Sequence, residues 1–198
     1  MTNTISTHPF EPFIPENATK LIIGTIPPYR FCVNGELFND DVRFYYGSRD
    51  NEFWDLISKV TNEKIVRENT EQAIEQRKSI LKKLGIGITD IIETCYHING
   101  KSDDGSLKII KQKDIRKLLK NHPQINTLIY TSTFVKSQMN TVGDKSYHTC
   151  IDKNERTFSL IINGKEYKAV VLYSPSPNAL RGVLEETRLI QYKKVFAI

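Results

Sequence analysis

The apolar positions of this chain fall into short runs that are separated by longer amphipathic stretches. Four of these runs, at residues 20–24, 86–92, 127–131 and 168–173, have the length and continuity of buried strands. The stretches between them carry apolar residues at the spacing of about 3.6 residues that is typical of helices. Strands that alternate with helices pack into a parallel sheet covered on both faces. The pattern therefore predicts an α/β fold with three layers, α/β/α, and a four-stranded, mostly parallel central sheet.

Helices are predicted in the amphipathic stretches. One begins near Asn51 and buries a face that includes Phe53 and Trp54, with Asp50 or Asn51 as the candidate N-cap. A second covers residues 70–84 and is followed by Gly85, a residue type that commonly ends helices. The others are expected at residues 115–122, 133–142 and 183–196. In the last of these, the residues expected to be buried are Leu184, Ile190, Val195 and Phe196.

Turn residues predict a hairpin near the C-terminal end. Asn163-Gly164 lies between two strand-like runs, 157–162 and 166–173, and Asn-Gly in this setting is a strong hairpin signal. Residues 1–19 are predicted to form an extended N-terminal arm, because prolines keep the chain extended there. No repeat or linker divides the sequence, so residues 1–198 are expected to form a single domain.

Composition narrows the classes of function. The net charge is +5 and the sequence pI is about 9.0, a mild basic bias that permits a polyanionic partner such as nucleic acid. Cys32, Cys95 and Cys150 are widely spaced, which argues against a structural zinc or iron–sulfur site and for a reducing compartment. A polar start and the lack of a membrane-length apolar run favour a cytoplasmic protein that contacts no membrane. We expect a monomer with no metal and no cofactor.

The first and the last of the four runs both end in stiff loops of proline and small residues. Gly24-Thr25-Ile26-Pro27-Pro28 follows the first run, and Ser174-Pro175-Ser176-Pro177-Asn178 follows the last. Proline cannot continue a central strand, so each strand must end there. The carboxyl ends of parallel strands open on one edge of a sheet, where such folds bind ligands. The two loops are therefore expected to face each other across a cleft; an ordinary strand exit is the alternative for the first loop.

These motifs, in this order, resemble those of the uracil-DNA glycosylase superfamily. Its members begin their pocket with Gly-x-x-Pro, to which Gly24-Thr25-Ile26-Pro27 is similar. The segment from Tyr46 to Trp54 is similar, without a gap, to one in mismatch-specific and hypoxanthine-DNA (deoxyinosine) glycosylases. Ser174-Pro175-Ser176-Pro177 resembles the last motif, and Asp90 stands where relatives end a strand with Asp. The resemblance implies a base-excision repair enzyme that hydrolyses the N-glycosidic bond of a deaminated base, uracil or hypoxanthine, flipped from DNA.

The resemblance also implies roles for the residues of the pocket. Tyr46 is expected to be the platform on which the flipped base stacks, and a packing tyrosine is the alternative. Asn51 is expected to bind the base edge or to position the attacking water, since an amide both donates and accepts hydrogen bonds; the alternative is a helix N-cap. Ser174 is expected to donate a hydrogen bond to the charge that develops on the base. The other residues expected around the base are Gly24, Thr25, Ile26, Pro27 and Ser176.

Two positions depart from the better-known members of the superfamily. Ile26 stands where they carry an Asp or Asn that orients water, and Ser174 stands where His is common. The hypoxanthine-type members share the first departure, which favours Asn51 as the working residue. Asp50 is expected to be a helix cap or a salt-bridge partner beside the pocket, and activation of the attacking water is the alternative. Asp90 is expected to hold a loop by hydrogen bonds, and a direct part in the chemistry is the alternative.

Contacts with DNA, either a damaged duplex or a single strand, are expected beside the two proline loops. Leu180 is the predicted wedge that holds the flipped base out of the stack, although it could instead pack under the final helix. Arg181 is the predicted phosphate contact, and Pro28 and Asn178 are expected to lie against the DNA. A run of Lys and Arg between residues 108 and 120 is either a further DNA contact or a solvated face.

Two other functions stay open from the sequence. The first is non-catalytic binding of a nucleic acid or nucleotide on the same fold, because Ile26 and Ser174 replace two familiar catalytic groups. The second is an unrelated α/β hydrolase that acts on a small nucleoside. A nucleophilic pair of Cys95 and His148 is also conceivable, but nothing in the spacing brings these two residues together.

Overall fold

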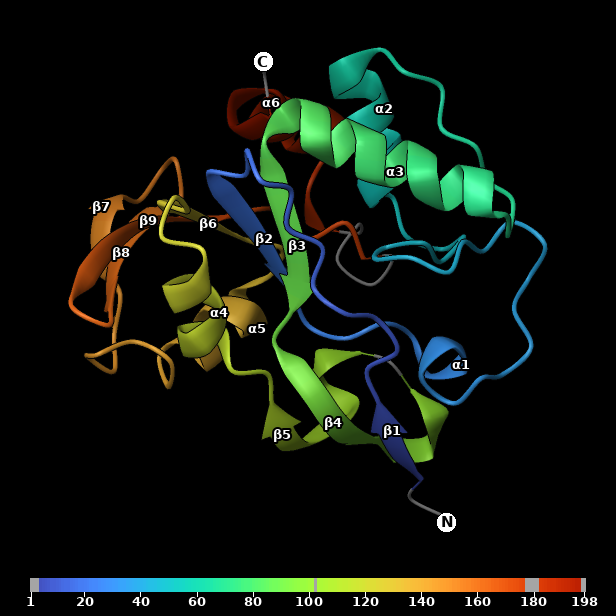
Figure 1. Ribbon diagram of the computed structural model, residues 1–198, viewed down its shortest axis with the longest axis horizontal. Helices are drawn as coiled ribbons and strands as arrows, with labels where there is room; N and C mark the ends of the chain where they lie inside the picture. Colours follow the sequence, from blue (N-terminus) through green and yellow to red (C-terminus); the bar gives the residue numbers. More distant parts are fainter. Residues whose placement is uncertain (1–3, 102, 177–181, 197–198) are drawn as a thin grey trace.

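The computed structural model describes residues 4–101, 103–176 and 182–196. Its main sheet has six strands in the order β3-β2-β6-β9-β8-β7 (Figure 1). The strands are β2 (Lys20–Gly24), β3 (Ile86–Asp90), β6 (Thr127–Tyr130), β7 (Thr149–Asp152), β8 (Thr157–Ile162) and β9 (Lys165–Val171). The first four strands in this order pair in parallel and correspond to the four predicted runs, whereas β8 and β7 pair antiparallel. The sheet is therefore mainly parallel, but it has six strands rather than the predicted four.

The two additional strands depend on the predicted hairpin. Asn163 and Gly164 have φ values of 53° and 74°, which are the left-handed values of a tight hairpin turn. The turn folds β8 back onto β9, so the hairpin joins the main sheet. Beyond it, β7 pairs with β8 at the edge, and all four of its residues are exposed. An exposed edge strand carries no apolar alternation, which is why the sequence pattern missed it.

Helices cover both faces of the main sheet (Figure 1). On one face, α2 (Phe53–Thr61), α3 (Glu71–Leu84) and α6 (Glu185–Phe196) share a core with Ile22 of β2. On the other, α4 (Ile115–Asn121) and α5 (Thr133–Met139) share a core with Leu21 and Ile23 of the same strand. Alternate residues of β2 thus enter opposite cores, as the period of two in a strand requires. The α/β/α layering follows from this alternation.

Local signals set the ends of α3. The hydroxyl oxygen of Thr70 accepts a hydrogen bond from the backbone N–H of Ala73, which caps the first turn. Gly85 follows the last turn with a φ of 64°, a conformation that glycine adopts without strain. The predicted helix over residues 70–84 is therefore confirmed. None of the helices within the described ranges combines the length and the apolar character that a membrane span requires.

The final helix buries only part of the predicted set: Phe196 is buried, and Val195 is partly buried against the core. Leu184 is 77% exposed and Ile190 is 54% exposed, so the prediction that they are buried is wrong. The residues of α6 that are buried are Arg188, Tyr192 and Phe196, which are spaced four apart. This spacing places them on one face of a helix. A hydrophobic pattern could not select that face, because its first member is an arginine.

A second, three-stranded sheet continues from the carboxyl end of β3 (Figure 1). It consists of β1 (Ile5–Thr7), β4 (Ile92–His97) and β5 (Leu107–Gln112) in the order β1-β4-β5, all antiparallel. The short turns η1 (Ile98–Gly100) and η2 (Asp104–Ser106) connect β4 to β5. The run predicted as one strand over residues 86–92 is therefore divided between β3 and β4. This sheet was not predicted.

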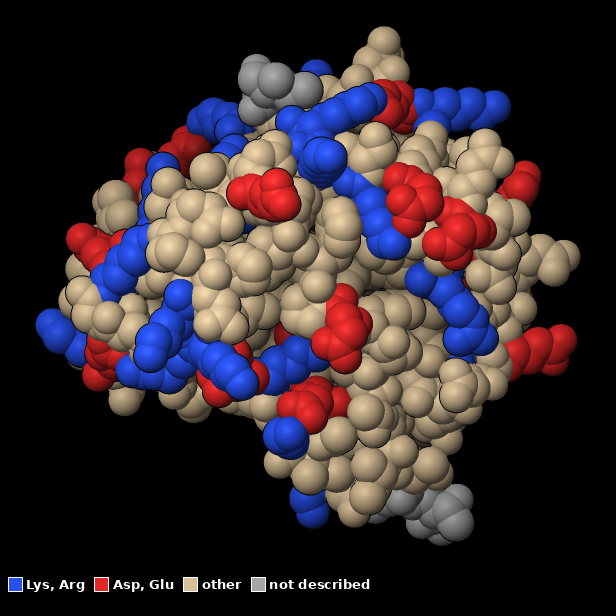
Figure 2. All heavy atoms as spheres, viewed as in Figure 1, with Lys and Arg blue, Asp and Glu red and all other residues tan. Residues whose placement is uncertain are grey.

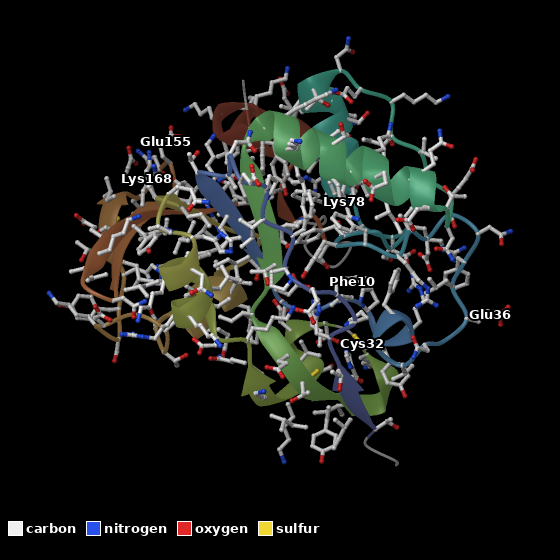
Figure 3. The ribbon with its side chains drawn as sticks, in the orientation of Figure 1. Phe10, Cys32, Glu36, Lys78, Glu155 and Lys168 are labelled. Atoms are coloured by element: carbon white, nitrogen blue, oxygen red, sulfur yellow. The ribbon has the colours of Figure 1, made fainter. Side chains whose placement is uncertain are left out.

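The N-terminal arm is anchored to the rest of the molecule. Residues 5–7 form β1, and Phe13 makes an isolated antiparallel bridge with Ile88 of β3. Phe10, labelled in Figure 3, is partly buried against the core, and its ring centroid is 6.5 Å from that of Phe31 in α1 (Tyr29–Cys32). The arm thus crosses the carboxyl end of β3 on its way to β2, and this path decides what surrounds Asp90.

Candidate active site

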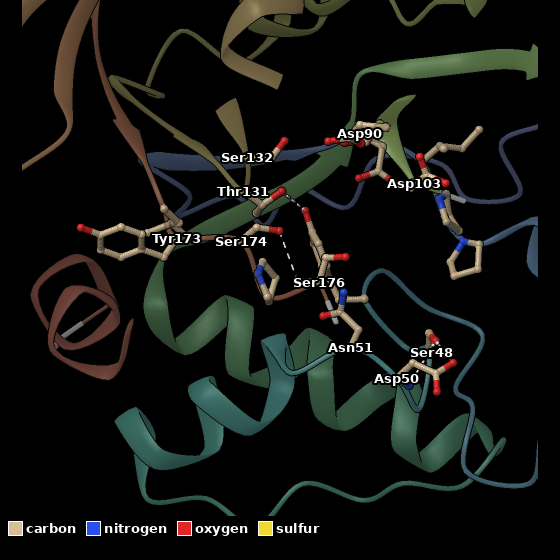
Figure 4. Close-up of a pocket in the computed structure, with 18 of the residues that line it drawn as sticks. Ser48, Asp50, Asn51, Asp90, Asp103, Thr131, Ser132, Tyr173, Ser174 and Ser176 are labelled. Carbon is tan, nitrogen blue, oxygen red and sulfur yellow. Dashed lines mark hydrogen bonds between the residues drawn. The ribbon is translucent and has the colours of Figure 1, made fainter. Parts of the chain in front are cut away.

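A cavity of about 880 Å³ opens at the carboxyl ends of the parallel strands. Its wall includes the loop Thr25–Pro28 after β2, Asp90 at the end of β3, residues 131–133 after β6, and residues 172–176 after β9. Figure 4 shows several of these side chains, together with Asn51 from the segment before α2. The two proline-containing loops therefore meet at one cavity, as the parallel sheet led us to expect.

Gly24 lies beside the cavity rather than in its wall. A Cβ atom at this position would be 2.2 Å from Oδ1 of Asp90 and 2.2 Å from the hydroxyl oxygen of Tyr46. Gly24 and Asp90 are also direct neighbours in the register of β2 and β3. Gly24 therefore allows two polar side chains to approach the end of β2, a close approach that any larger residue would block.

One face of the Tyr46 ring packs against another aromatic ring, and its hydroxyl forms a hydrogen bond. The ring stacks on Phe53 with centroids 4.5 Å apart, and the hydroxyl is 3.0 Å from Oγ1 of Thr131. The backbone of Tyr46 has a φ of 54°, a left-handed conformation that is uncommon for a residue with a side chain. Burial, and then the charge of Asp90, raise the pKa of the phenol well above its usual value. Tyr46 thus lines the cavity as a neutral, fixed aromatic ring.

Asn51 combines a structural role with a position in the cavity wall. Its Oδ1 accepts a hydrogen bond of 2.9 Å from the backbone N–H of Phe53, the first residue of α2. Glu52 is the N-cap of this helix, so Asn51 stabilises the helix start from one residue earlier. Among the residues that the structure describes, no group of the protein bonds to its Nδ2. The Nδ2 group therefore presents a donor for a ligand.

The loop after β9 presents two serines to the cavity. The hydroxyl oxygen of Ser174 accepts a hydrogen bond of 3.2 Å from the backbone N–H of Ser176 (Figure 4). The hydroxyl hydrogen of Ser174 can then be donated elsewhere. The carbonyl of Pro175 accepts from the backbone N–H of Glu52, which ties this loop to the start of α2. The predicted DNA contacts Asn178, Leu180 and Arg181 lie outside the described residues.

Asp50 lies at the exposed rim of the cavity. Its side chain is 54% exposed, and it faces Arg30 at 3.4 Å and Arg49 at 3.8 Å. Arg30 also forms a two-point ion pair with the buried Asp41, at 2.7 and 2.8 Å. Asp50 thus belongs to a cluster of ion pairs at the rim of the cavity. Further cations in the wall, none of them singled out in the sequence, are Lys101, Arg156 and Arg188.

Asp90 is held by a residue that the sequence pattern did not reveal. Its Oδ2 is 2.8 Å from Nε2 of His8, and the two side chains are only 6% and 1% exposed. Nδ1 of His8 is in turn 3.1 Å from the ammonium nitrogen of Lys113. His8 belongs to the arm, Asp90 to β3, and Lys113 to the segment after β5. No sequence spacing relates these three residues, so only the folded chain brings them together.

The conceivable nucleophilic pair of Cys95 and His148 does not form. Sγ of Cys95 lies 3.8 Å from His97, and burial raises the pKa of the thiol to about 11. His148 instead bonds to the hydroxyl of Tyr130 at 3.1 Å and to Oδ1 of Asn140 at 2.8 Å. A thiol whose pKa is raised stays protonated at neutral pH and is not an activated nucleophile.

No protein-family model matches this chain, and no curated protein sequence matches it. Its fold, in contrast, is similar to that of a solved structure. This is the solution NMR structure of a protein from Methanosarcina acetivorans that is called a "putative Uracil DNA glycosylase". The TM-score is 0.65 over 98% of this chain and 97% of that chain, with 20% sequence identity. The chain therefore has a uracil-DNA glycosylase-like fold.

The charges around the site are mixed. On the face shown in Figure 2, Lys and Arg side chains are interspersed with Asp and Glu. In the basic stretch between residues 108 and 120, Lys111 pairs with Glu93 and Arg116 pairs with Asp144. That stretch is therefore partly neutralised within the molecule. Within the described ranges, no three His, Cys, Asp or Glu side chains are grouped so that they could hold a metal ion.

Proposed function

We propose that this protein is a DNA glycosylase that hydrolyses the N-glycosidic bond of uracil or hypoxanthine after the nucleotide has flipped out of DNA. The observation that carries the proposal is the convergence of Tyr46, Asn51 and Ser174 on one cavity, at the strand ends of a uracil-DNA glycosylase-like fold. These residues come from three separate segments. The cavity, at about 880 Å³, falls within the size range of small-molecule sites, which is about 300–1,000 Å³.

The flipped base would lie against Tyr46. One face of this ring is covered by Phe53, so the base would stack on the other face. Ile26 and Pro27 supply apolar wall, which suits a planar base. Thr25 and Ser176 supply hydroxyls near the base edge. Base–aromatic stacking contributes about 1–3 kcal/mol per base, which helps to offset the cost of unstacking the nucleotide.

The polar groups of the pocket suit the leaving base. Breaking the glycosidic bond places negative charge on the base, and hydrogen-bond donors stabilise such charge when they are fixed in advance. The amide of Asn51 and the hydroxyl of Ser174 are two such donors. Uracil and hypoxanthine both carry a ring carbonyl, which accepts from an amide donor. Pro28, Asn178, Leu180 and Arg181 would then meet the DNA around the extruded nucleotide.

A panel of oligonucleotides tests the proposal. Duplexes and single strands that carry one uracil, hypoxanthine or xanthine are incubated with the protein, and abasic sites are revealed by alkaline cleavage. We expect cleavage at uracil or hypoxanthine, and loss of it in Asn51→Ala. Release of base from free nucleosides but not from DNA would contradict the proposal and favour a nucleoside hydrolase.

Non-catalytic binding of nucleic acid is the second candidate. It is favoured by one observation: Ile26 carries no polar group, and the side chain of Asn51 is a neutral amide, so neither can accept a proton from water. This function predicts tight binding to oligonucleotides that contain the modified base, with no abasic product at any enzyme concentration.

A further inference from the structure

The proposed glycosylase site presents donors, but the hydrolysis also requires an acceptor. Water attacks the sugar and must lose a proton, so a group with a free lone pair has to stand in the pocket. The Asn51 side chain is a neutral amide: its Nδ2 only donates, and its Oδ1, which accepts from the backbone N–H of Phe53, is too weak a base to take a proton from water. Ile26, where better-known relatives carry a polar residue, has no acceptor. The base must therefore be one of the carboxylates of the cavity wall.

Four carboxylates line the cavity, and their surroundings differ. Asp50 is exposed and shared between Arg30 and Arg49. Asp103 accepts a hydrogen bond from the hydroxyl of Ser106 and lies in the turn region between β4 and β5. Burial raises the pKa of Asp104, so this carboxyl keeps its proton to a higher pH. The remaining carboxylate, Asp90, is buried at a strand end and fixed on one side only.

The geometry of Asp90 leaves one oxygen for a ligand. Oδ2 is bonded to His8, whereas Oδ1 approaches the end of β2 beside Gly24 and the hydroxyl of Tyr46. Among the described residues, Oδ1 has no hydrogen-bond donor from the protein. A buried carboxylate oxygen without a protein donor, in the wall of a cavity that is lined by Asp90, is placed to accept a proton from a bound water.

Both ring nitrogens of His8 are held in place. Its Nδ1 lies 3.1 Å from Nζ of Lys113, 3.1 Å from the backbone nitrogen of Phe10 and 2.9 Å from the carbonyl oxygen of Phe10. The same carbonyl oxygen accepts a hydrogen bond from Lys113 at 2.9 Å. On the other side of the ring, Nε2 donates to Oδ2 of the Asp90 carboxylate at 2.8 Å. The imidazole thus connects the ammonium of Lys113 to the carboxylate of Asp90 and fixes the orientation of that carboxylate.

We propose that Asp90 is the general base of the reaction and that His8 and Lys113 are its positioning residues; this inference rests on the proposed glycosylase function. Oδ1 of Asp90 takes a proton from water while the water oxygen bonds to C1′ of the sugar. The C1′–N bond breaks, and its electron pair leaves with the base. The proton on Asp90 then passes to the departed base, so the products are the free base and an abasic sugar. The ionised carboxylate also favours the positive charge that develops on the sugar.

The first test compares Asp90→Asn with wild type in single-turnover cleavage of the substrate found in the oligonucleotide panel. General-base catalysis contributes about 10²–10⁴-fold, so we expect the rate to fall by about 100-fold or more. Binding to the same duplex, measured by fluorescence anisotropy before cleavage, should change less than about threefold, because the amide keeps the shape of the carboxylate. Asp40→Asn is the matched control, since Asp40 is exposed and does not line the cavity; it should cleave at the wild-type rate.

The second test separates positioning from folding. His8→Ala removes the donor to Oδ2, whereas His8→Gln can return an amide N–H to nearly the same place. We expect His8→Ala to lose rate without losing DNA affinity, and His8→Gln to recover a large part of that rate. A structural role alone would lower the melting temperature in both variants and leave the rate below the melting point unchanged. If Asp90→Asn fails to fold, the comparison of His8→Ala with His8→Gln still tests whether Asp90 acts as the general base.

The outcomes distinguish this inference from the proposed function. If wild type releases no base from any oligonucleotide, the glycosylase function is wrong, and the general base with it. If wild type cleaves and Asp90→Asn cleaves equally fast, only the role of Asp90 is wrong. If Asp90→Asn keeps its rate but now prefers the other of the two bases, uracil or hypoxanthine, then Asp90 binds the base and does not activate water. That result would overturn the inference.

Discussion

Two hydrogen-bonded networks begin at the carboxyl end of β6 and lie on opposite faces of the sheet. Thr131, just after the strand, faces the cavity and meets the hydroxyl of Tyr46 at 3.0 Å. Tyr130, one residue earlier, packs in the opposite core, and its hydroxyl bonds to Nε2 of His148 at 3.1 Å. Nδ1 of that histidine is 2.8 Å from Oδ1 of Asn140. We refer to these as the cavity side and the core side of β6.

The two sides differ in charge rather than in burial. On the core side, the hydrogen-bond partners of His148 are neutral, and burial, followed by the charge of Lys136, lowers its pKa to about 4. On the cavity side, His8 lies between Asp90 and Lys113. A neutral network stabilises a fold, but it offers no charged group for a reaction. A buried histidine by itself therefore says little about function; the charge of the groups that contact it distinguishes the two sides.

The largest effect is expected on the cavity side, at Asn51. Asn51→Ala should lower the single-turnover rate by about 10²–10³-fold, the usual cost of removing one preorganised donor. The lost hydrogen bond to Phe53 should lower the free energy of unfolding by about 0.5–2 kcal/mol. Asn51→Asp keeps the bond to Phe53 but lacks the amide donor, so it should restore stability and not the rate. If Asn51→Ala melts early but cleaves at full rate below its melting point, Asn51 only stabilises the helix.

Gly24→Ala should disturb the cavity side through packing. The new methyl group would meet Asp90 and Tyr46 at 2.2 Å, and such overpacking costs about 1–3 kcal/mol of stability. The cleavage rate should fall as well, because both side chains must move. Gly182→Ala is the control, since its Cβ would meet no atom within 4 Å. Chemical denaturation of both variants checks the prediction, and an unchanged stability in Gly24→Ala would contradict it.

Tyr46 tests whether the ring or the hydroxyl matters on the cavity side. Tyr46→Ala should weaken binding to a duplex with the modified base by about 1–3 kcal/mol, the contribution of base stacking. Tyr46→Phe keeps the ring and should bind almost as tightly as wild type. Titrations followed by fluorescence anisotropy give both affinities. Equal losses in the two variants would show that the bond to Thr131, and not stacking, holds the base.

Tyr130→Phe should affect the core side alone. It removes the hydroxyl that bonds to Nε2 of His148, which should cost about 1 kcal/mol of unfolding free energy. The cleavage rate should stay at the wild-type value, because His148 and Tyr130 do not line the cavity. A loss of rate at unchanged stability would mean that the two sides of β6 are coupled.

A pH dependence is also expected from the core side. The folded state lowers the pKa of His148 to about 4, whereas an unfolded chain keeps a value of about 6.5. As the pH falls, the unfolded state binds the proton first, so this contribution to stability is complete above about pH 6.5 and is lost as the pH falls towards about 4. Denaturation at several pH values should show this loss in wild type and a smaller one in His148→Gln. Parallel curves for the two proteins would contradict it.

Local sequence patterns predicted the parts of the fold that depend on neighbouring residues. The four parallel strands, the helix over residues 70–84 with Thr70 and Gly85 at its ends, and the hairpin turn at Asn163-Gly164 all follow from short-range physical chemistry. The edge strand β7 and the three-stranded sheet were missed. Strands of this kind lack continuous apolar runs, and their pairing is decided by distant parts of the chain.

The site can also be divided into features that the sequence predicted and features that only the folded chain decided. Strand-ending prolines predicted that the loops after β2 and β9 meet at one cavity, and the resemblance of the motifs implied that Tyr46, Asn51 and Ser174 line it. The sequence by itself thus determined where the cavity lies, because proline ends a strand through local chemistry, and its motifs indicated which donors surround the cavity. Only the tertiary structure decided that His8 crosses the end of β3 and, with Lys113, fixes Asp90. The physical reason is that a buried charge is stable only with partners, and those partners come from segments that no sequence period relates.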